Sequence, residues 1–259
     1  MTSRLLIKIG GRAFEGEQGF KDLAEALKST RDAEIVIVHG GGAEISQALK
    51  DAHRKTEFID GIRLTRAEDI KIVEAVLSKT INQRIASWLE KHGVSCSPMS
   101  GKTRQLFVVE PLTCQGRDLG YVGKIKQVNT GVVLERLKAG QVPVVSPIST
   151  DEKGESYNVN ADSAAAALAA AIGCTDLVFV TDVPGVLVDD EIRPSLTVRK
   201  AQALIAGGTI KGGMVAKMKS AFEALHQNVP RVHIMQWHGP QTLHRIIKGK
   251  PETGTTITS

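Results

Sequence analysis

The sequence is poor in cysteine and contains no long apolar run. Its three cysteines, Cys96, Cys114 and Cys174, are odd in number and far apart in the chain. That spacing excludes a disulfide framework and a paired zinc site. No apolar run approaches the roughly 18 residues of a membrane span, and no charged-then-apolar leader opens the chain. We therefore expect a cytoplasmic protein that does not act at a membrane.

Aromatic residues are also scarce, since only six Phe, two Trp and two Tyr occur among 259 residues. Few stacking platforms are therefore available for the bases of a nucleic acid. The net charge is +5 at pH 7, but Lys and Arg are scattered along the chain rather than gathered in one basic stretch. We expect no nucleic-acid partner, because a mild basic excess suits a small polyanionic substrate equally well.

Three widespread glycine motifs are missing as well. The stretch "GKT" at 101–103 lacks the first glycine of a P-loop, whose position is taken by Cys96. The dinucleotide pattern G-x-G-x-x-G does not follow the first apolar run. The stretch "HGGG" at 39–42 resembles an oxyanion loop of esterases, but the G-x-S-x-G nucleophile turn is absent from the chain. These absences argue against a P-loop enzyme, a dinucleotide-binding enzyme and a serine hydrolase.

What the sequence does contain is an alternation of apolar, strand-like runs and helix-like stretches. The apolar runs are mostly continuous, which is typical of strands buried on both faces of a parallel sheet. With 42% hydrophobic residues, the chain has ample material for a full core. These features predict an α/β fold, a three-layer αβα sandwich with a mainly parallel central sheet. The predicted strands span 4–10, 34–40, 142–148, 176–183 and 231–237, and the predicted helices 19–30, 43–52, 66–92, 130–139, 161–172, 198–206 and 213–227.

Two stretches interrupt this alternation, and one polar stretch divides the chain. Residues 104–129 and 185–196 contain short β-prone runs separated by Gly, Asp and Pro, which predicts hairpins. The polar stretch "STDEKGESYNVNAD" at 149–162 is the best candidate for a boundary. We therefore expect two lobes, residues 1–149 and 150–259.

Two of the predicted strands end in glycines, and the first contains a lysine. Glycines at the carboxyl end of a buried strand expose backbone N–H groups beside a helix terminus, which suits an anion, although tight turns alone would also explain them. Lys8 interrupts the apolar run "LLIKIGG". A buried lysine is costly unless an anion meets it, so Lys8 either faces solvent at a frayed end or belongs to an anion site. The adjacent glycines favour the second interpretation.

Two later polar residues each have a structural and a functional interpretation. Asp162 opens an alanine-rich helix, where it or Ser163 would serve as the N-cap. Asn158 and Asn160 precede it in a loop that should lie at the carboxyl edge of the sheet. Lys217 lies on an amphipathic helix after a glycine loop, where a lysine is usually solvated. The apolar face of this helix is predicted to belong to the core, with Met214, Met218, Phe222 and Leu225.

The order and spacing of eight motifs resemble those of the N-acetylglutamate kinases within the amino acid kinase superfamily. The resemblance runs from residue 4 to the C-terminal "GTTI". "VHGGG" is shared across the superfamily, whereas "GIRLT" together with "NVNAD" and "GGMVAK" is more specific. Residues 236–238, Gln-Trp-His, depart from the usual wording of the family. The motifs are "IKIGG", "VHGGGAEI", "DGIRLT", "DLGYVGKI", "PVVSPI", "NVNAD", "TDVPGV" and "GGMVAKMKSA".

This resemblance implies an amino acid kinase (carbamate kinase-like) fold, with an N-terminal lobe for the acyl-amino acid and for dimerisation and a C-terminal lobe for ATP. It implies transfer of phosphate from ATP to the γ-carboxylate of N-acetyl-L-glutamate, the second step of arginine biosynthesis. The implied catalytic residues are Lys8, Asp162 and Lys217, with the aspartate orienting both lysines. The implied substrate-binding residues are Gly41, Gly42, Arg63 and Asn158, and the implied nucleotide-binding residues are Gly10, Gly11, Thr181, Asp182, Val183, Gly185, Val186, Ile210, Gly213, Met214 and Lys217.

The residues agree with this chemistry. A carboxylate acceptor is already ionised at neutral pH, with a reference pKa of about 4.3, so the reaction needs no general base. The motifs contain no catalytic Cys or Ser dyad, and their one histidine, His39, is expected to support its loop. Two anions must meet, and cations with backbone dipoles lower that barrier. We expect Mg²⁺ to be held mainly by the phosphates of ATP, with no metal site formed by the protein.

The sequence leaves the substrate and the assembly open. Relatives in the superfamily phosphorylate N-succinylglutamate, or glutamate or aminoadipate attached to a carrier protein, and their acyl pockets differ by a few side chains. A ligand sensor that has lost the chemistry, or a binding protein for acidic metabolites, is an alternative to a kinase. Only seven residues precede Lys8, so we expect a homodimer, paired through the helix near 66–92, rather than an arginine-inhibited hexamer.

Overall fold

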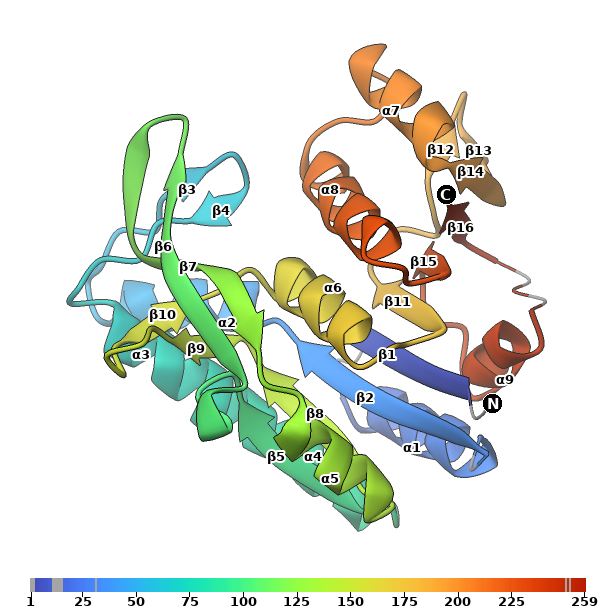
Figure 1. Cartoon of the computed structure of the whole chain (residues 1–259), viewed down its shortest axis with the longest axis horizontal. Helices are drawn as coiled ribbons and strands as arrows, with labels where there is room; N and C mark the ends of the chain where they lie inside the picture. The colour runs from blue at the N-terminus through green and yellow to red at the C-terminus, as the bar shows by residue number, and fades with distance from the viewer. Residues whose placement is uncertain (1–2, 11–15, 31, 250, 252) are drawn as a thin grey trace.

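The described part of the chain is organised around one large sheet. The computed structural model describes residues 3–10, 16–30, 32–249, 251 and 253–259. Six neighbouring strands of this sheet run parallel, and β16 pairs antiparallel with β15, which confirms the mainly parallel sheet (Figure 1). The strands lie in the order β14 (Ser195–Thr197), β16 (Thr255–Thr258), β15 (Arg231–Met235), β11 (Asp176–Val180), β1 (Ser3–Ile9), β2 (Ala33–His39), β8 (Val142–Ser146) and β5 (Cys96–Ser100).

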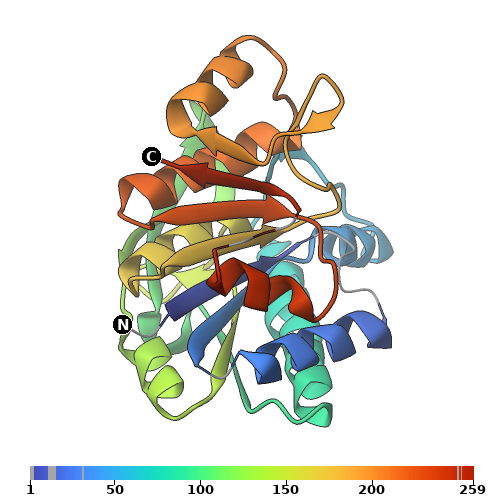
Figure 2. The same ribbon diagram turned by 90° about the vertical axis from the view of Figure 1, so that its right-hand side faces the viewer.

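Helices cover both faces of this sheet and make it the middle layer of a sandwich. One apolar cluster joins the sheet to α5, α6, α7 and α8, and a second joins the opposite face to α1, α2, α4 and α9. Figure 2 shows α1 and α9 side by side on that second face. The three-layer prediction is confirmed. The helices are α1 (Glu17–Ser29), α2 (Gly42–Asp51), α3 (Ile70–Glu74), α4 (Asn82–Lys91), α5 (Gly131–Lys138), α6 (Ala161–Ala171), α7 (Val198–Ala206), α8 (Gly213–His226) and α9 (Gln241–Ile247).

Smaller sheets decorate the ends of the central strands. A four-stranded closed sheet is dominated by a long antiparallel hairpin, which confirms the hairpin expected over 104–129. The second expected hairpin, within 185–196, is also present. These elements are β6 (Phe107–Cys114), β7 (Arg117–Val128), β9 (Ile148–Thr150) and β10 (Ser156–Asn158), with the hairpins β3 (Phe58–Ile59) with β4 (Ile62–Arg63) and β12 (Leu187–Val188) with β13 (Glu191–Ile192), and a short 3₁₀ turn, η2 (Thr103–Gln105).

The sequence patterns missed four elements of the central sandwich, as well as the short strands β3, β4, β9 and β10. Strand β5 reads "CSPMS", whose Pro and Ser hide the apolar signal, and β14 and β16 are only three and four residues long. Helix α9 has seven residues, too few for a clear period of 3.6. The helix expected over 66–92 begins at Ile70 and contains a wide π-helical stretch, η1 (Ala75–Ile81), between α3 and α4.

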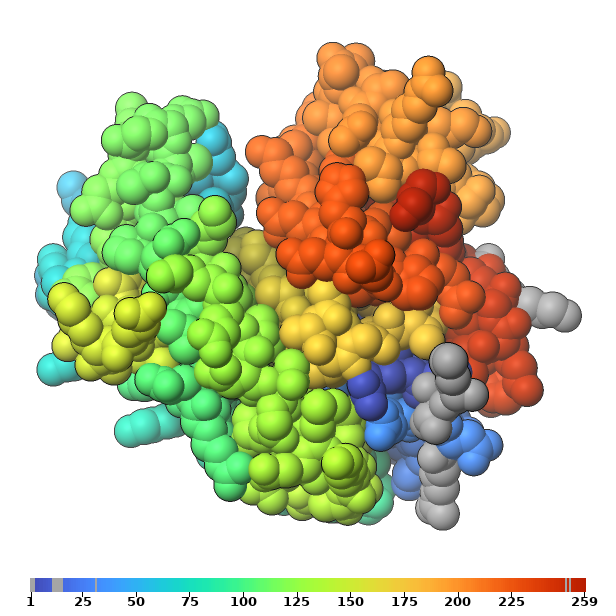
Figure 3. All heavy atoms as spheres, in the orientation of Figure 1, coloured from blue at the N-terminus to red at the C-terminus, as the bar shows by residue number. Residues whose placement is uncertain are grey.

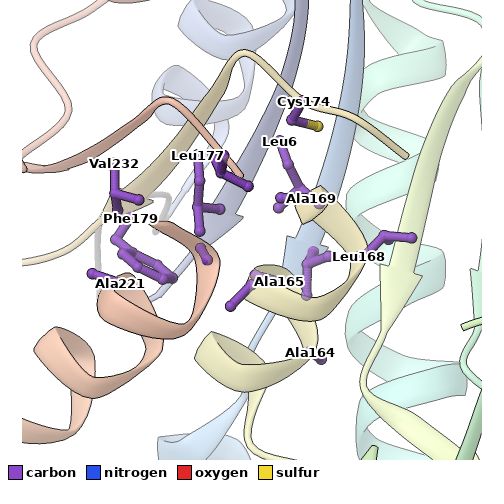
Figure 4. Packing of buried hydrophobic residues seen from close by; sticks show 14 of the residues in the cluster. Leu6, Ala164, Ala165, Leu168, Ala169, Cys174, Leu177, Phe179, Ala221 and Val232 are labelled. Atoms are coloured by element: carbon purple, nitrogen blue, oxygen red, sulfur yellow. The ribbon is translucent and has the colours of Figure 1, made fainter. Parts of the chain in front are cut away.

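The core beneath the candidate site is packed by small side chains. Helix α6 contributes Ala165, Leu168 and Ala169, which are fully buried. Figure 4 shows these residues against Leu6 and Leu177 of the sheet. Alanines let the axis of α6 lie close to the strands, so the N-terminus of this helix is held firmly at the carboxyl edge of the sheet. Within the described residues, no helix has both the length and the apolar character that a membrane crossing requires.

Candidate active site

The alternation of side chains along β1 explains where Lys8 points. Leu5 and Ile7 belong to the cluster under α1, whereas Leu6 belongs to the cluster under α6 and α8. Because side chains alternate along a strand, Lys8 faces the same side as Leu6. Lys8 is only 8% exposed, so the interpretation of a solvent-facing lysine at a frayed strand end is wrong.

Asp162 lies opposite Lys8, at the start of α6. The Nζ atom of Lys8 is 2.7 Å from Oδ1 of Asp162, and both side chains are largely buried. The N-cap of α6 is Asn160, whose side-chain oxygen accepts hydrogen bonds from the N–H groups of Asp162 and Ser163 at 2.8 and 3.2 Å. The expected cap at Asp162 or Ser163 is therefore wrong by two or three residues. Since Asn160 caps the helix, the carboxylate of Asp162 is left for the two lysines.

Lys217 reaches the same carboxylate from α8. The N-cap residue of this helix, Gly212, has φ 60°, a conformation that glycine adopts without strain. The Nζ of Lys217 donates a hydrogen bond to Oδ2 of Asp162 at 3.0 Å and lies 5.5 Å from the centre of the Phe179 ring. Its side chain is 13% exposed, so it is not the solvated lysine that is usual on a helix face. The three residues predicted to act together therefore meet in space.

Burial and charge set the protonation of this cluster. Burial alone would raise the pKa of Asp162, but the attraction of Lys8 and Lys217 outweighs it and leaves the pKa below its ordinary value. Burial lowers the pKa of Lys217, and the attraction of Asp162 offsets only part of that effect. Asp162 is thus an anion at neutral pH, and its carboxylate lies between the amino groups of Lys8 and Lys217.

A pocket opens beside this cluster, lined by Lys8 and Asp162 but not by Lys217. Its volume is about 200 Å³, and it lies where the glycine turn after β2 meets the N-terminus of α6. The hollow between the β6–β7 hairpin and α8 is visible in Figure 3, with α6 at its base. Backbone N–H groups at the starts of α2 and α6 favour an anion there. The pocket is lined by Lys8, Gly40, Gly41, Gly42, Ile45, Phe58, Gly61, Ile62, Arg63, Leu77, Val122, Pro147, Asn158, Val159, Asn160, Ala161 and Asp162.

The predicted substrate residues Arg63 and Asn158 both line this pocket. Arg63 is 7% exposed and donates from Nη2 to the carbonyl of Gly42 at 2.7 Å and to Oγ of Ser46 at 2.9 Å. Asn158 is buried and donates from Nδ2 to Oγ1 of Thr65 at 3.1 Å. Together with Gly41 and Gly42, all four predicted substrate residues therefore line one cavity.

His39 is uncharged at neutral pH. Its ring is fully enclosed, and burial, together with the positive charges of Arg84 and Lys8, lowers its pKa to about 4 despite a hydrogen bond to Gly40. The prediction that His39 supports the loop agrees with this position. A neutral, enclosed imidazole has no path to a substrate proton.

The predicted nucleotide residues that the structure describes do not line the pocket, and Gly10 has a close approach to Lys8. Gly10 follows β1, and a Cβ on it would lie 2.4 Å from Nζ of Lys8, so a glycine is needed there. Val186 and Ile210 are buried in the core, so their side chains pack beneath the surface. Gly11 lies outside the described residues. Thr181, Asp182, Val183 and Gly185 lie in the loop after β11, and Gly213, Met214 and Lys217 lie in α8.

The apolar walls of the pocket were not predicted from the sequence. Ile45, Leu77 and Val122 line it, and an apolar residue on a helix or strand gives the same signal as any core residue. Phe58 is the exception, since it is 54% exposed and its ring lies 4.7 Å from the guanidinium carbon of Arg63. A large aromatic side chain five residues before the motif arginine could have drawn attention to it.

Comparisons with known proteins match this arrangement. The model of the "Amino acid kinase family" matches residues 3–236. The chain is 39% identical over 250 residues to the acetylglutamate kinase of Geobacillus stearothermophilus, covering 92% of this chain and 96% of that protein. It is 40% identical over 242 residues to the acetylglutamate kinase of Chloroflexus aurantiacus, covering 92% and 94%.

Solved structures show the same fold. The structure of smu.665 from Streptococcus mutans UA159 matches with a TM-score of 0.83 at 28% identity, over 100% of this chain and 99% of that one. A carbamate kinase from Giardia, at 14% identity, matches with a TM-score of 0.70 over 100% and 99%, which supports the fold alone. The chain therefore belongs to the amino acid kinase family.

Proposed function

We propose that this protein transfers the terminal phosphate of ATP to the γ-carboxylate of N-acetyl-L-glutamate, giving N-acetyl-L-glutamyl 5-phosphate, the second step of arginine biosynthesis. The observation that carries the proposal is the buried cluster of Lys8, Asp162 and Lys217 at the edge of an anion pocket. Relatives at 39% and 40% identity that are named acetylglutamate kinase support the choice of substrate.

The cluster suits a reaction between two anions. In the proposed reaction, Lys8 and Lys217 stabilise the transferring phosphoryl group, because each ammonium group has three donors and Asp162 takes one. Asp162 holds both side chains in place and keeps them charged. The acceptor carboxylate needs no base, which agrees with the neutral, enclosed ring of His39.

The pocket supplies the contacts for the acyl-amino acid. We assign Arg63 and Asn158 to the carboxylate groups of the substrate, and the N–H groups of Gly41 and Gly42 to the reacting oxygen atoms. A guanidinium group binds a carboxylate with two parallel hydrogen bonds, which fixes its orientation. The apolar side chains of Leu77 and Val122 are then available to the acyl group.

We assign ATP to the opposite side of the cluster, over the loop after β11 and the start of α8. In the part of the chain that the structure describes, no three His, Cys, Asp or Glu side chains converge as a metal site. Asp162 is engaged by two lysines, so Mg²⁺ would be held mainly by the nucleotide phosphates, where it neutralises their charge. The division into an acyl-amino-acid lobe, 1–149, and an ATP lobe, 150–259, is part of this proposal.

We also propose a cytoplasmic homodimer that pairs through the exposed face of the long helix formed by α3, η1 and α4. ATP and amino acid intermediates are available in the cytoplasm, and an α-helical surface of this length offers a self-complementary interface. Light scattering should give twice the chain mass of 27.8 kDa. A monomer or a hexamer would contradict the proposal.

A coupled ADP-release assay, with hydroxylamine trapping of the acyl phosphate, tests the function. The substrates to compare are N-acetylglutamate, N-succinylglutamate, glutamate, aspartate and carbamate. We expect the highest kcat/KM with N-acetylglutamate and loss of ADP release in Lys8→Ala. A preference for another acceptor would overturn the substrate, and ATP binding without turnover on any of them would indicate a ligand sensor.

A further inference from the structure

The long helix beside the pocket widens where it faces the glycine turn. The N–H of Asn82 bonds to the carbonyl of Leu77, five residues back, as in a π-helix. Leu77 and Ile81 press against Gly41, since a Cβ there would lie 2.9 and 2.3 Å from their end carbons. The glycine turn and this helix therefore form one packed unit, and π-helical turns occur often at functional sites.

Asn82 links this helix to two neighbouring strands. It is 2% exposed, and its Nδ2 lies 2.9 Å from the carbonyl of Val144 and 3.0 Å from Nε2 of His39. An amide nitrogen is only a donor, so Nε2 of His39 accepts and carries no proton. The proton of the neutral ring is then on Nδ1, which donates to the carbonyl of Gly40 at 2.9 Å.

This chain of hydrogen bonds fixes one peptide plane. In a trans peptide, the carbonyl of Gly40 and the N–H of Gly41 point in opposite directions. His39 follows Ile35 and Ile37 in the alternation along β2, so its ring lies on the side of α4. With the carbonyl of Gly40 held toward that side, the N–H of Gly41 is directed toward α6 and Lys8. Among the described residues, this N–H donates no hydrogen bond to a backbone carbonyl.

We propose that Asn82 and His39 are positioning residues that aim the N–H of Gly41 into the pocket for the reacting anion. Neither side chain touches the substrate, and both act through the orientation of one peptide. The inference rests on the proposed function, because the effect of that N–H is measured in the phosphoryl transfer. It goes beyond that function by assigning a role to a side chain on the long helix, outside the family motifs.

Asn82→Leu removes the donor to His39 at similar volume and tests the relay. We expect kcat to fall by about 10- to 100-fold, less than the about 100- to 1,000-fold typical of removing a transition-state donor outright, with KM for ATP within about twofold. Ile85→Val, on the same helix and equally buried at 2% exposure, is the matched control for lost packing. Equal kcat values in the two variants would overturn the proposal.

A second pair of variants distinguishes a positioning role of His39 from a role in packing alone. His39→Asn keeps an N–H donor near the Nδ1 position, whereas His39→Leu removes it. We expect His39→Asn to keep most of the wild-type kcat and His39→Leu to match Asn82→Leu. Equal losses in both would show that the ring only fills space, and would contradict the inference even if Asn82→Leu fails to fold.

The tautomer of His39 gives a readout independent of turnover. Two-bond ¹H–¹⁵N spectra of the wild-type protein should show Nδ1 protonated and Nε2 unprotonated at neutral pH. A proton on Nε2 would overturn the relay, whatever the substrate of the enzyme. Absence of kinase activity in the wild type with this tautomer present would instead overturn the proposed function and leave the hydrogen-bond chain intact.

Discussion

Two buried aspartates lie near opposite ends of the strands of the central sheet, and each is paired with two basic side chains. Asp162, at the carboxyl edge, meets Lys8 and Lys217 at 2.7 and 3.0 Å. Asp176, at the amino end of β11, meets Arg231 at 2.7 Å and His233 at 2.8 Å. Both carboxylates are largely buried, with side-chain exposures of 14% and 1%, yet only Asp162 borders the described pocket.

The partners of the two aspartates explain the difference. Arg231 grips Asp176 with two nitrogens, at 2.7 and 2.9 Å, and His233 bridges from Asp176 to Thr256. These bonds join β11, β15 and β16, and the fork of an arginine fits one carboxylate closely. Each lysine of the Asp162 cluster keeps further donors that can meet another anion. The Asp176 cluster therefore connects strands, whereas the lysines of the Asp162 cluster remain able to bind another anion.

The strongest test of this comparison removes the lysines. Lys8→Ala or Lys217→Ala should lower kcat about 1,000-fold, because a positioned cation beside the transferring phosphoryl group is lost. Substrate dissociation constants should change much less. Steady-state kinetics with equilibrium binding of both substrates checks this result. Near-normal turnover in both variants would refute the assignment of the Asp162 cluster.

A substitution of Arg63 tests whether the pocket next to the Asp162 cluster binds the acyl-amino acid. Arg63→Ala should raise the apparent KM for the acyl-amino acid by about 10- to 100-fold, the value of a hydrogen-bonded charge pair, and leave KM for ATP almost unchanged. Initial-rate kinetics with each substrate varied in turn measures the two constants. An effect confined to ATP would contradict the substrate assignment.

The Asp176 cluster should affect stability rather than turnover. Burial alone raises the pKa of Asp176, but hydrogen bonds from His233 and Arg231 lower it from 3.8 to about 2. The folded state thus binds this proton less tightly than the unfolded chain, so the carboxylate stabilises the fold above about pH 4 by about 2 kcal/mol. That contribution is lost as the pH falls from about 4 to about 2.

Asp176→Asn should therefore lower the free energy of unfolding by about 2 kcal/mol at neutral pH and leave kcat unchanged. Urea unfolding at several pH values checks both the size and the pH dependence. The gap between variant and wild type should narrow toward pH 2. A constant gap at every pH would contradict the role of the carboxylate charge.

The smallest expected effect is on the pH profile. Since burial lowers the pKa of His39 to about 4, no histidine of the site titrates near neutrality, and kcat should vary less than about twofold between pH 6 and 8. Lys217 must stay charged, and its pKa is lowered by burial, so kcat should decline on the alkaline side. A bell-shaped profile centred near pH 6.5 would indicate a titrating histidine.

The sequence predicted well which residues meet at the carboxyl ends of the strands, because some of them break local rules. A lysine inside an apolar strand and glycines at two strand ends are conspicuous, and Lys8, Asp162 and Lys217 meet as expected. The family resemblance was needed for Lys217, since a lysine on a helix face usually has no special role. The fold followed from continuous apolar runs, except where strands were short or contained Pro.

The Asp176 cluster, at the other end of the strands, could not be predicted in the same way. Asp176 and His233 are 57 residues apart and lie side by side only because β11 and β15 pair. Asn160 was missed as the cap of α6 because three polar residues within four positions, Asn160, Asp162 and Ser163, each suit an N-cap. The link from Asn82 to His39 depends on the wide turn of η1, which leaves no pattern in the sequence.

The central claim is that the two clusters divide turnover and stability between them. The most direct test measures kcat and the free energy of unfolding on the same samples of Lys217→Met and Asp176→Asn. We predict that Lys217→Met loses turnover while keeping or gaining stability, because burial disfavours the charge of Lys217 and Lys8 still pairs with Asp162. Asp176→Asn should lose stability and keep its kcat. Turnover and stability falling together in both variants would contradict the account.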